Sequence, residues 1–181
     1  MNEGLIPRRY AMALYKLTED HGNSDKVYEE MKMVAGSFAT NPDMQKLLSN
    51  PFVDRGEKAK VLVTAAGGNV EQDYRSFVDL ILNNERAQYA NLMALAYCDV
   101  FRKAHNIARV KIITAFKLGD DEMRKLRNLV EKAYPGMKLE FSEVVDKDLI
   151  GGFIIDVDDQ RLDASISNEI EQLRLKLLRS N

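Results

Sequence analysis

The sequence predicts a helical domain followed by a small domain of mixed α+β structure. Apolar residues recur at helical spacing through about the first 105 residues, and from residue 108 β-branched and charged residues alternate. The 181 residues contain 45% hydrophobic and 30% charged side chains, as is typical of a folded protein with a buried core. We expect an N-terminal six-helix bundle in residues 1–105 and, in residues 106–181, a short sheet with two helices.

The first three helices are marked by apolar stripes and by residues that begin or end helices. Gly22 ends the first helix. Asn41-Pro42-Asp43 begins the third with a capping side chain, a fixed φ and an acid near the positive end of the helix, which stops before Asn50-Pro51. The stripes are Ile6, Tyr10, Ala13, Leu14 and Leu17 in the first helix, Val27, Met31, Val34 and Phe38 in the second, and Met44, Leu47 and Leu48 in the third.

The next three helices continue this pattern. Asp54 and Glu57 have the spacing of a capping box at the start of the fourth helix, and Gly67-Gly68 ends it. The sixth helix fades near His105, without a linker rich in Gly, Ser or Pro before the following strand. The stripes are Val61, Leu62 and Ala65 in the fourth helix, Val70, Tyr74, Phe77, Val78 and Ile81 in the fifth, and Leu92, Ala96, Tyr97, Val100 and Phe101 in the sixth.

The remaining residues alternate between strand and helix patterns. Gly119-Asp120-Asp121 opens a helix that Pro135-Gly136 closes. Ser165 caps a last helix with the apolar stripe Ile166, Ile170, Leu173 and Leu177. The predicted strands are 108–115, 139–145, 152–157 and the strand-like run 160–163.

No pattern of catalytic or ligand-binding residues emerges. The single cysteine, Cys98, and the distant histidines, His21 and His105, provide neither a disulfide framework nor a zinc site nor a nucleophile with its base. No phosphate-binding loop motif occurs, and 26 basic against 28 acidic residues give a net charge of −2, which disfavours nucleic acid as a partner. We expect no catalytic residue, no cofactor and no metal, and a role in protein interaction.

Four aspartates, Asp156, Asp158, Asp159 and Asp163, cluster near the end of the chain. Concentrated carboxylates provide the oxygen ligands that hard cations prefer, so a small divalent-metal-dependent enzyme is the alternative function. Asp158-Asp159 lies between two strand-like runs, where aspartate favours a turn, and alternation directs the carboxylates to different faces. A hairpin turn is therefore the favoured interpretation.

Four segments carry motifs of a known family. They are Arg9-Tyr10-Ala11-Met12-Ala13-Leu14, Asn50-Pro51, Leu82-Asn83-Asn84-Glu85-Arg86, and Val145-Asp146-Lys147-Asp148-Leu149-Ile150-Gly151-Gly152-Phe153 with the following Leu162-Asp163-Ala164-Ser165. In this order they resemble the motifs of the delta subunit of F-type ATP synthases, whose mitochondrial equivalent is the oligomycin-sensitivity-conferring protein. The resemblance runs from about residue 6 to residue 178.

This resemblance implies a non-catalytic stator subunit of a proton-translocating ATP synthase, which couples rotation to ATP synthesis. The helical domain would bind the N-terminal helical ends of the alpha subunits, and the C-terminal domain would bind the b subunit of the peripheral stalk. It also implies one copy per complex, a monomer when isolated, and a place on the cytoplasmic face of the bacterial cell membrane. No apolar run approaches the length of a membrane span, so we expect membrane association only through the complex.

The resemblance assigns the first and fifth helices to contact with the alpha subunit. Each candidate contact residue could instead belong to the bundle core, because both interpretations use the same apolar stripe. The residues at the C-terminal motif are interpreted as framework, forming a chain turn and a helix cap. The contact candidates are Tyr10, Ala13, Leu14, Tyr74, Phe77 and Val78, and the framework residues are Gly151, Gly152, Asp163 and Ser165.

Overall fold

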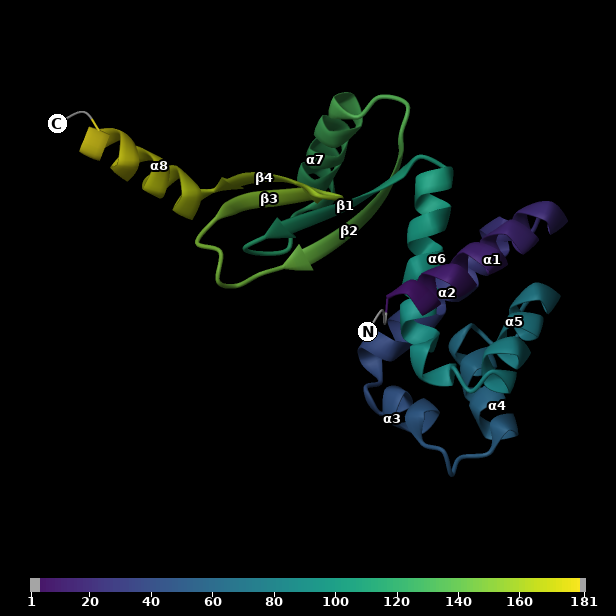
Figure 1. The fold of residues 1–181 in the computed structure, drawn as a ribbon. Coiled ribbons are helices and arrows are strands. Elements are labelled where there is room, and N and C mark those ends of the chain that lie inside the picture. Colours follow the sequence, from purple (N-terminus) through teal and green to yellow (C-terminus); the bar gives the residue numbers. More distant parts are fainter. Residues whose placement is uncertain (1–3, 180–181) are drawn as a thin grey trace. The chain divides into compact units, whose positions relative to one another are not determined.

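The computed structural model describes residues 4–179, which form two compact units divided between Ala104 and His105 (Figure 1). Among these residues the first unit is helical, and the second combines a four-stranded sheet with two helices. The predicted order of a helical part followed by an α+β part is therefore confirmed. No helix within residues 4–179 is both long and apolar enough to cross a membrane.

The helices of the first unit begin and end close to capping and helix-breaking residues. Gly22 follows the first helix in the left-handed conformation, with φ of +70°. Asp54 caps the fourth helix, since its carboxylate accepts a hydrogen bond from the Gly56 N–H at 2.7 Å. The elements are α1 (Leu5–His21), α2 (Ser24–Thr40), α3 (Asp43–Ser49), α4 (Arg55–Ala65), α5 (Gln72–Asn83), the 3-10 turn η1 (Ala87–Tyr89) and α6 (Ala90–Ala104).

Two features differ from the predicted helices. α5 begins at Gln72, so Val70 precedes it, because Gly67 and Gly68 both have positive φ and carry the chain through a turn first. A 3-10 turn, η1, precedes α6. Glu85, between α5 and η1, has φ of +55°. A 3-10 turn of three residues is too short to show an apolar periodicity from which it could be predicted.

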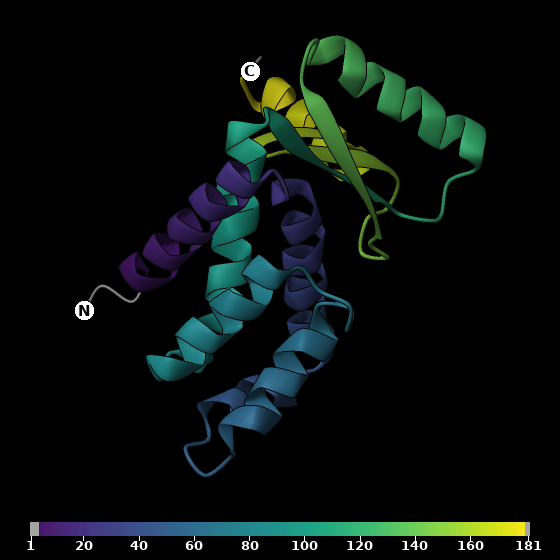
Figure 2. The same cartoon turned by 90° about the vertical axis from the view of Figure 1, so that its right-hand side faces the viewer.

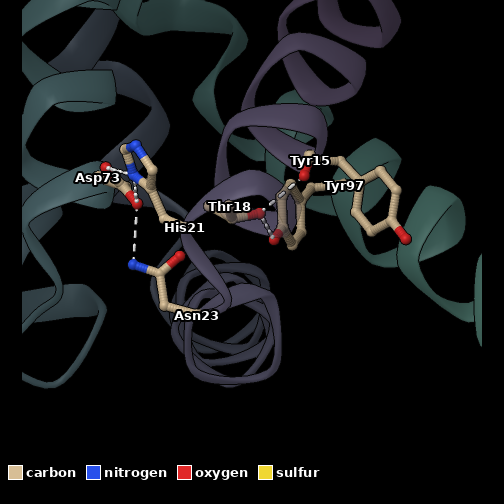
Figure 3. A network of polar contacts seen from close by, with 6 residues as sticks. All are labelled: Tyr15, Thr18, His21, Asn23, Asp73 and Tyr97. Atoms are coloured by element: carbon tan, nitrogen blue, oxygen red, sulfur yellow. Dashed lines mark hydrogen bonds and ion pairs between the residues drawn. The ribbon is translucent and has the colours of Figure 1, made fainter.

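α6 is the central helix of the first unit, and it packs against α1 and α2 (Figure 2). Its Met93, Ala94 and Tyr97 are fully buried. The Tyr97 hydroxyl forms a 2.8 Å hydrogen bond with Thr18 Oγ1 on α1 (Figure 3). The Thr18 hydroxyl in turn donates a hydrogen bond to the Tyr15 carbonyl at 3.0 Å. Burial raises the pKa of Tyr97, so the hydroxyl keeps its proton and remains able to donate a hydrogen bond inside the unit.

The sheet of the second unit has the strand order β2-β1-β3-β4 (Figure 1). Its elements are β1 (Ile107–Thr114), α7 (Asp120–Ala133), β2 (Lys138–Val145), β3 (Gly152–Val157), β4 (Gln160–Ser165) and α8 (Ile166–Arg179). β1 and β2 run parallel, with α7 as the connection that returns the chain. β3 is antiparallel to both β1 and β4, and β4 continues into α8 without a loop.

One face of the sheet packs against α7. Alternation along β1 directs every second side chain to this face, where residues of β3 and α7 meet them. The buried members of this core are Ala108, Val110, Ile112, Met123, Val130, Ile155 and Val157. The second unit therefore has a hydrophobic core of its own.

The aspartate pair between β3 and β4 forms a two-residue hairpin turn, as predicted. Val157 pairs with Gln160, and Asp158 adopts φ of +47°. The Asp158 carboxylate also accepts a hydrogen bond from the Arg109 N–H at 3.1 Å, which fixes the turn to β1.

The two glycines of the C-terminal motif lie where β3 begins. A Cβ at Gly151 would meet the side chain of Ile166. Gly152 has φ of +78°, and a Cβ there would collide with the Ala164 carbonyl oxygen of the neighbouring strand. Both the backbone conformation and the close approach of β4 therefore require glycine at residue 152.

Asp163 and Ser165 join β4 to α8. The Asp163 carboxylate accepts a hydrogen bond from the Ser165 N–H at 3.0 Å, and the Ser165 hydroxyl accepts one from the Asn168 N–H at 3.3 Å. The second bond satisfies a backbone donor in the first turn of α8. The pKa of Asp163 is lowered because Ser165 donates hydrogen bonds to its carboxylate.

Candidate functional site

Three of the four aspartates that cluster in the second unit accept internal hydrogen bonds. Arg161 donates two bonds to Asp156, from Nε at 2.7 Å and from Nη2 at 2.9 Å, and this pairing lowers the pKa of Asp156. Asp158 and Asp163 accept backbone N–H groups. Among residues 4–179, no group of three or more His, Cys, Asp or Glu side chains could hold a metal ion. The alternative of a divalent-metal enzyme therefore has no support in the described part of the chain.

The residue types that enzymes use most often in catalysis, here Cys98 and His21, lie in surroundings that indicate structural roles. Cys98 is buried on α6, and Nδ1 of His21 at the end of α1 lies 2.8 Å from the Asp73 carboxylate. Neither lies in a nucleophile–base arrangement that the structure shows. The surfaces open to a partner are consequently the candidate functional sites.

α1 and α5 lie side by side, and Tyr10 links the start of one to the end of the other. The Tyr10 ring meets the Phe77 ring edge-on, with centroids 6.5 Å apart, and the Tyr10 hydroxyl accepts a hydrogen bond from Asn84 Nδ2 at 2.9 Å. The Arg86 guanidinium lies 5.8 Å from the centroid of the same ring. Tyr10 is thereby held at this edge of the two helices.

The opposite ends of α1 and α5 are tied by polar side chains (Figure 3). The Asp73 carboxylate lies 2.8 Å from His21 Nδ1 and accepts a hydrogen bond from Asn23 Nδ2, also at 2.8 Å. Asp73 is only 7% exposed, so these partners satisfy a carboxylate that has lost most of its water. The two helices are thus connected at both ends.

The six predicted contact residues fall into two groups. Leu14, Tyr74, Phe77 and Val78 are buried within the first unit, and the Tyr74 hydroxyl donates a hydrogen bond to the Leu62 carbonyl at 2.9 Å. Ala13 is exposed and Tyr10 is partly exposed. Four candidates therefore belong to the core of the first unit, and two are accessible to a partner. Their role in partner binding stays a prediction.

Sequence reasoning missed two accessible apolar residues on these helices. Leu17 is 40% exposed and follows Tyr10 and Ala13 at helical spacing, while Leu80 is 48% exposed and follows Phe77 by three residues. Because Tyr10 contacts Phe77, these positions belong to the adjoining sides of α1 and α5. We call the surface formed by Tyr10, Ala13, Leu17 and Leu80 the α1–α5 face. Its partial exposure could be learned only from the packed structure.

A shallow hollow of about 540 Å³ extends along α1 beside Ala13. Its apolar lining includes Leu5 and Met12, which are 53% and 38% exposed. Its charged lining is entirely basic, with Arg8, Arg9 and Lys16. This combination suits an amphipathic segment that carries acidic residues beside its apolar side.

α8 presents a second apolar surface. The helix packs mainly against β4, and the stripe predicted from the sequence remains accessible along its length. Ile170, Leu173 and Leu177 are 56%, 59% and 71% exposed. Large exposed patches of apolar side chains are typical of interaction sites. We call Ile166, Ile170, Leu173 and Leu177 the α8 stripe.

A buried carboxylate on α2 lies beneath the start of α5. Glu30 is 6% exposed, and its Oε1 accepts a hydrogen bond from the Glu71 N–H at 2.6 Å, while Oε2 accepts none from the described residues. Burial raises the pKa of Glu30, and the bond from Glu71 opposes this rise only in part. The ionised form therefore costs stability in the folded chain.

This costly carboxylate gives a pH-dependent stability. The raised pKa of Glu30 means that the folded chain loses stability as pH rises through it, starting above the ordinary value of 4.5. A Glu30→Gln variant cannot ionise. When both proteins are measured from about pH 5 to about pH 8, we therefore expect its free energy of unfolding to rise relative to that of the wild type as pH increases. Urea denaturation followed by circular dichroism measures the difference, with exposed Glu57→Gln as the control. A constant difference across this range would contradict the prediction.

Comparison with known proteins gives consistent matches along the chain. The family model described as ATP synthase delta (OSCP) subunit matches residues 6–177. Relatives named ATP synthase subunit delta are 35% identical over 179 residues in Phocaeicola vulgatus, covering 98% of this chain and 96% of the relative, and 36% identical over 178 residues in Parabacteroides distasonis, covering 98% of each.

A solved structure shares the fold. A chain in the cryo-EM structure of the Toxoplasma gondii mitochondrial ATP synthase hexamer superposes with a TM-score of 0.74 at 18% identity. The match covers 95% of this chain and 97% of the other. Both units therefore occur together in another protein with the same overall topology.

Proposed function

The chain belongs to the ATP synthase delta (OSCP) subunit family, and we propose that it links the catalytic head of a proton-translocating F-type ATP synthase to its peripheral stalk. It is a structural subunit of the stator type and not an enzyme. In this proposal its partners are the alpha subunit and the b subunit, with one copy in each complex. It is monomeric when isolated and reaches the cytoplasmic face of the bacterial cell membrane only through the complex.

The observation that carries this proposal is the presence of two accessible apolar surfaces on two separate compact units. The α1–α5 face belongs to the first unit and the α8 stripe to the second. A protein with one such surface would bind one partner, whereas two surfaces on independent cores suit a connector. Connection between two larger partners requires affinity and stiffness but no chemical step.

The α1–α5 face suits an N-terminal helix of the alpha subunit. The small side chain of Ala13 permits close approach of a helix, and Tyr10, Leu17 and Leu80 provide apolar area around it. Tyr10 is already held by Phe77 and Asn84, so little freedom is lost when a partner covers it. The basic hollow beside Ala13 would attract acidic residues on the flank of the partner helix.

The α8 stripe suits a helical segment of the stalk. Ile166, Ile170, Leu173 and Leu177 recur at the spacing by which helices pack along a common seam. Because the stripe is exposed over its whole length, a second helix could cover it without rearranging β4. This is the interaction that we assign to the b subunit.

Reconstitution with both partners tests the proposal. The full chain is mixed with a synthetic peptide of the alpha-subunit N-terminal helix and a C-terminal fragment of the b subunit, both from the same organism. We expect each to bind alone and both to bind together in equimolar amounts, as measured by titration calorimetry and analytical size exclusion. A variant with Leu173→Asp and Leu177→Asp should lose the b fragment and keep the alpha peptide, since buried charge opposes helix pairing. Failure of both partners to bind would refute the proposal, and stalk binding by the double variant would refute the role of α8.

A further inference from the structure

The start of α5 is held by side chains from α1, α2 and the loop between them. Glu30 accepts the Glu71 N–H. Asp73 lies within hydrogen-bond distance of His21 and accepts a bond from Asn23, as Figure 3 shows. At the rim, Lys26 Nζ lies 2.8 Å from Glu71 Oε1. The polar contacts at this end of α5 are thus made with the α1–α2 corner.

These contacts fix the position of α5 as well as its end. The first N–H groups of a helix have no partner within it, and a cap from the same chain segment would satisfy them locally. Here Glu30 provides the acceptor from another helix, 41 residues away in sequence. A bond of this kind is lost when α5 shifts away from α2, so it opposes displacement of the whole helix.

The free-energy cost of burying the Glu30 carboxylate indicates that this residue positions α5 and does not serve to stabilise the fold. Its carboxylate is buried, and Oε2 accepts no hydrogen bond from residues 4–179. The nearby charges of Lys26 and Arg75 favour ionisation, but Glu71 opposes it and burial dominates. An apolar side chain of similar length would avoid this cost. What an apolar side chain would not provide is the acceptor for the Glu71 N–H.

We propose that Glu30 and Asp73 are positioning residues for partner binding, which hold the start of α5 and thereby fix the shape of the α1–α5 face. This inference rests on the proposed function, since the alpha-subunit helix is the ligand. Leu80 lies on α5. Tyr10 contacts Phe77 on α5 and Asn84 directly after it. A displaced α5 would separate Leu80 from Tyr10, Ala13 and Leu17 on α1.

Two substitutions at residue 30 separate position from stability. Glu30→Met keeps the length of the side chain and removes the acceptor, whereas Glu30→Gln keeps an acceptor without the charge. We expect Glu30→Met to weaken binding of the alpha-subunit peptide to the full chain by roughly tenfold without lowering the melting temperature. Glu30→Gln should restore most of the affinity. If Glu30 served stability alone, peptide affinity would follow the melting temperature, and Glu30→Met would bind the peptide as well as Glu30→Gln does. The positioning role predicts weaker binding by Glu30→Met.

A readout without ligand accompanies these measurements. Hydrogen exchange at the Glu71 amide, followed by NMR of the free chain, should accelerate by roughly tenfold or more in Glu30→Met and stay close to wild type in Glu30→Gln. Asp73→Asn weakens the second tether and should also reduce peptide affinity. Asp79→Asn, an exposed change on the same helix, is its matched control and should bind as the wild type does.

The outcomes distinguish the two proposals. If the wild type binds the peptide and Glu30→Met and Asp73→Asn bind it equally well, the positioning role is wrong while the proposed function stands. If the wild type binds no peptide, the proposed function fails and this inference fails with it. Weaker binding by Glu30→Met together with rescue by Glu30→Gln establishes the role. Loss of the melting transition in Glu30→Met, with Asp73→Asn binding normally, would assign Glu30 to folding and overturn the inference.

Discussion

Replacing Ala13 by arginine is expected to weaken binding of the alpha-subunit peptide by roughly tenfold or more while the helical circular dichroism stays unchanged. Ala13 is exposed, so the longer side chain extends into solvent in the free chain and leaves the core intact. In the complex the same side chain would occupy the space of the partner helix between Tyr10 and Leu17. Its charge would also have to be buried without a partner.

Titration calorimetry with the full chain measures this effect. Ala39→Arg, at an exposed position on α2, is the matched control and should bind the peptide with wild-type affinity. If Ala13→Arg also binds normally, the α1–α5 face is not the binding surface. If its helical signal is lost, Ala13 contributes to the core and not to a partner contact.

Replacing Gly152 by alanine is expected to destabilise the second unit by roughly 3–4 kcal/mol. Alanine is strained at φ of +78°, and its Cβ would collide with the Ala164 carbonyl oxygen across the β3–β4 pair. Relief of this collision requires β4 to move, which disturbs the cap of α8 at Ser165. Both the conformation and the space at this position oppose the change.

Gly136→Ala provides the matched control for this prediction. Gly136 has φ of +84°, but nothing lies within 4 Å of a Cβ built there. This variant therefore carries the conformational strain alone, at a cost of about 1 kcal/mol. Chemical denaturation of both variants measures the difference. Equal destabilisation would show that the close approach of β4 contributes nothing.

Local patterns in the sequence were sufficient to predict most helices and strands. The stripe from Ile166 to Leu177 predicted α8, and the aspartate pair predicted the β3–β4 turn, because both depend on residues close together in the chain. The strand order could not be predicted in this way. Pairing of β1 with β2 joins Ile107 to Lys138 across the whole of α7, and no local pattern specifies such a partner.

The candidate site could be predicted only in part for a related reason. Periodicity identifies an apolar side of a helix but does not tell whether that side meets the core or a partner. Phe77 and Tyr74 therefore proved to be buried, whereas Leu17 and Leu80 remained accessible. Glu30 did carry a signal, since it stands among the apolar positions Val27, Met31 and Val34 of α2. An acid at such a place indicates a specific hydrogen-bond partner, although not which one.

The direct passage from β4 into α8 has a mechanical consequence. A flexible loop between them would stretch before it transmitted any load, whereas here a force applied along α8 reaches the sheet at Ser165 itself. β4 pairs with β3 over six residue positions, from Gly152–Ser165 to Val157–Gln160, and strain on the helix is shared by that whole ladder. A load on α8 is therefore passed to β3 and β4 through continuous backbone, with no loop between them to extend first.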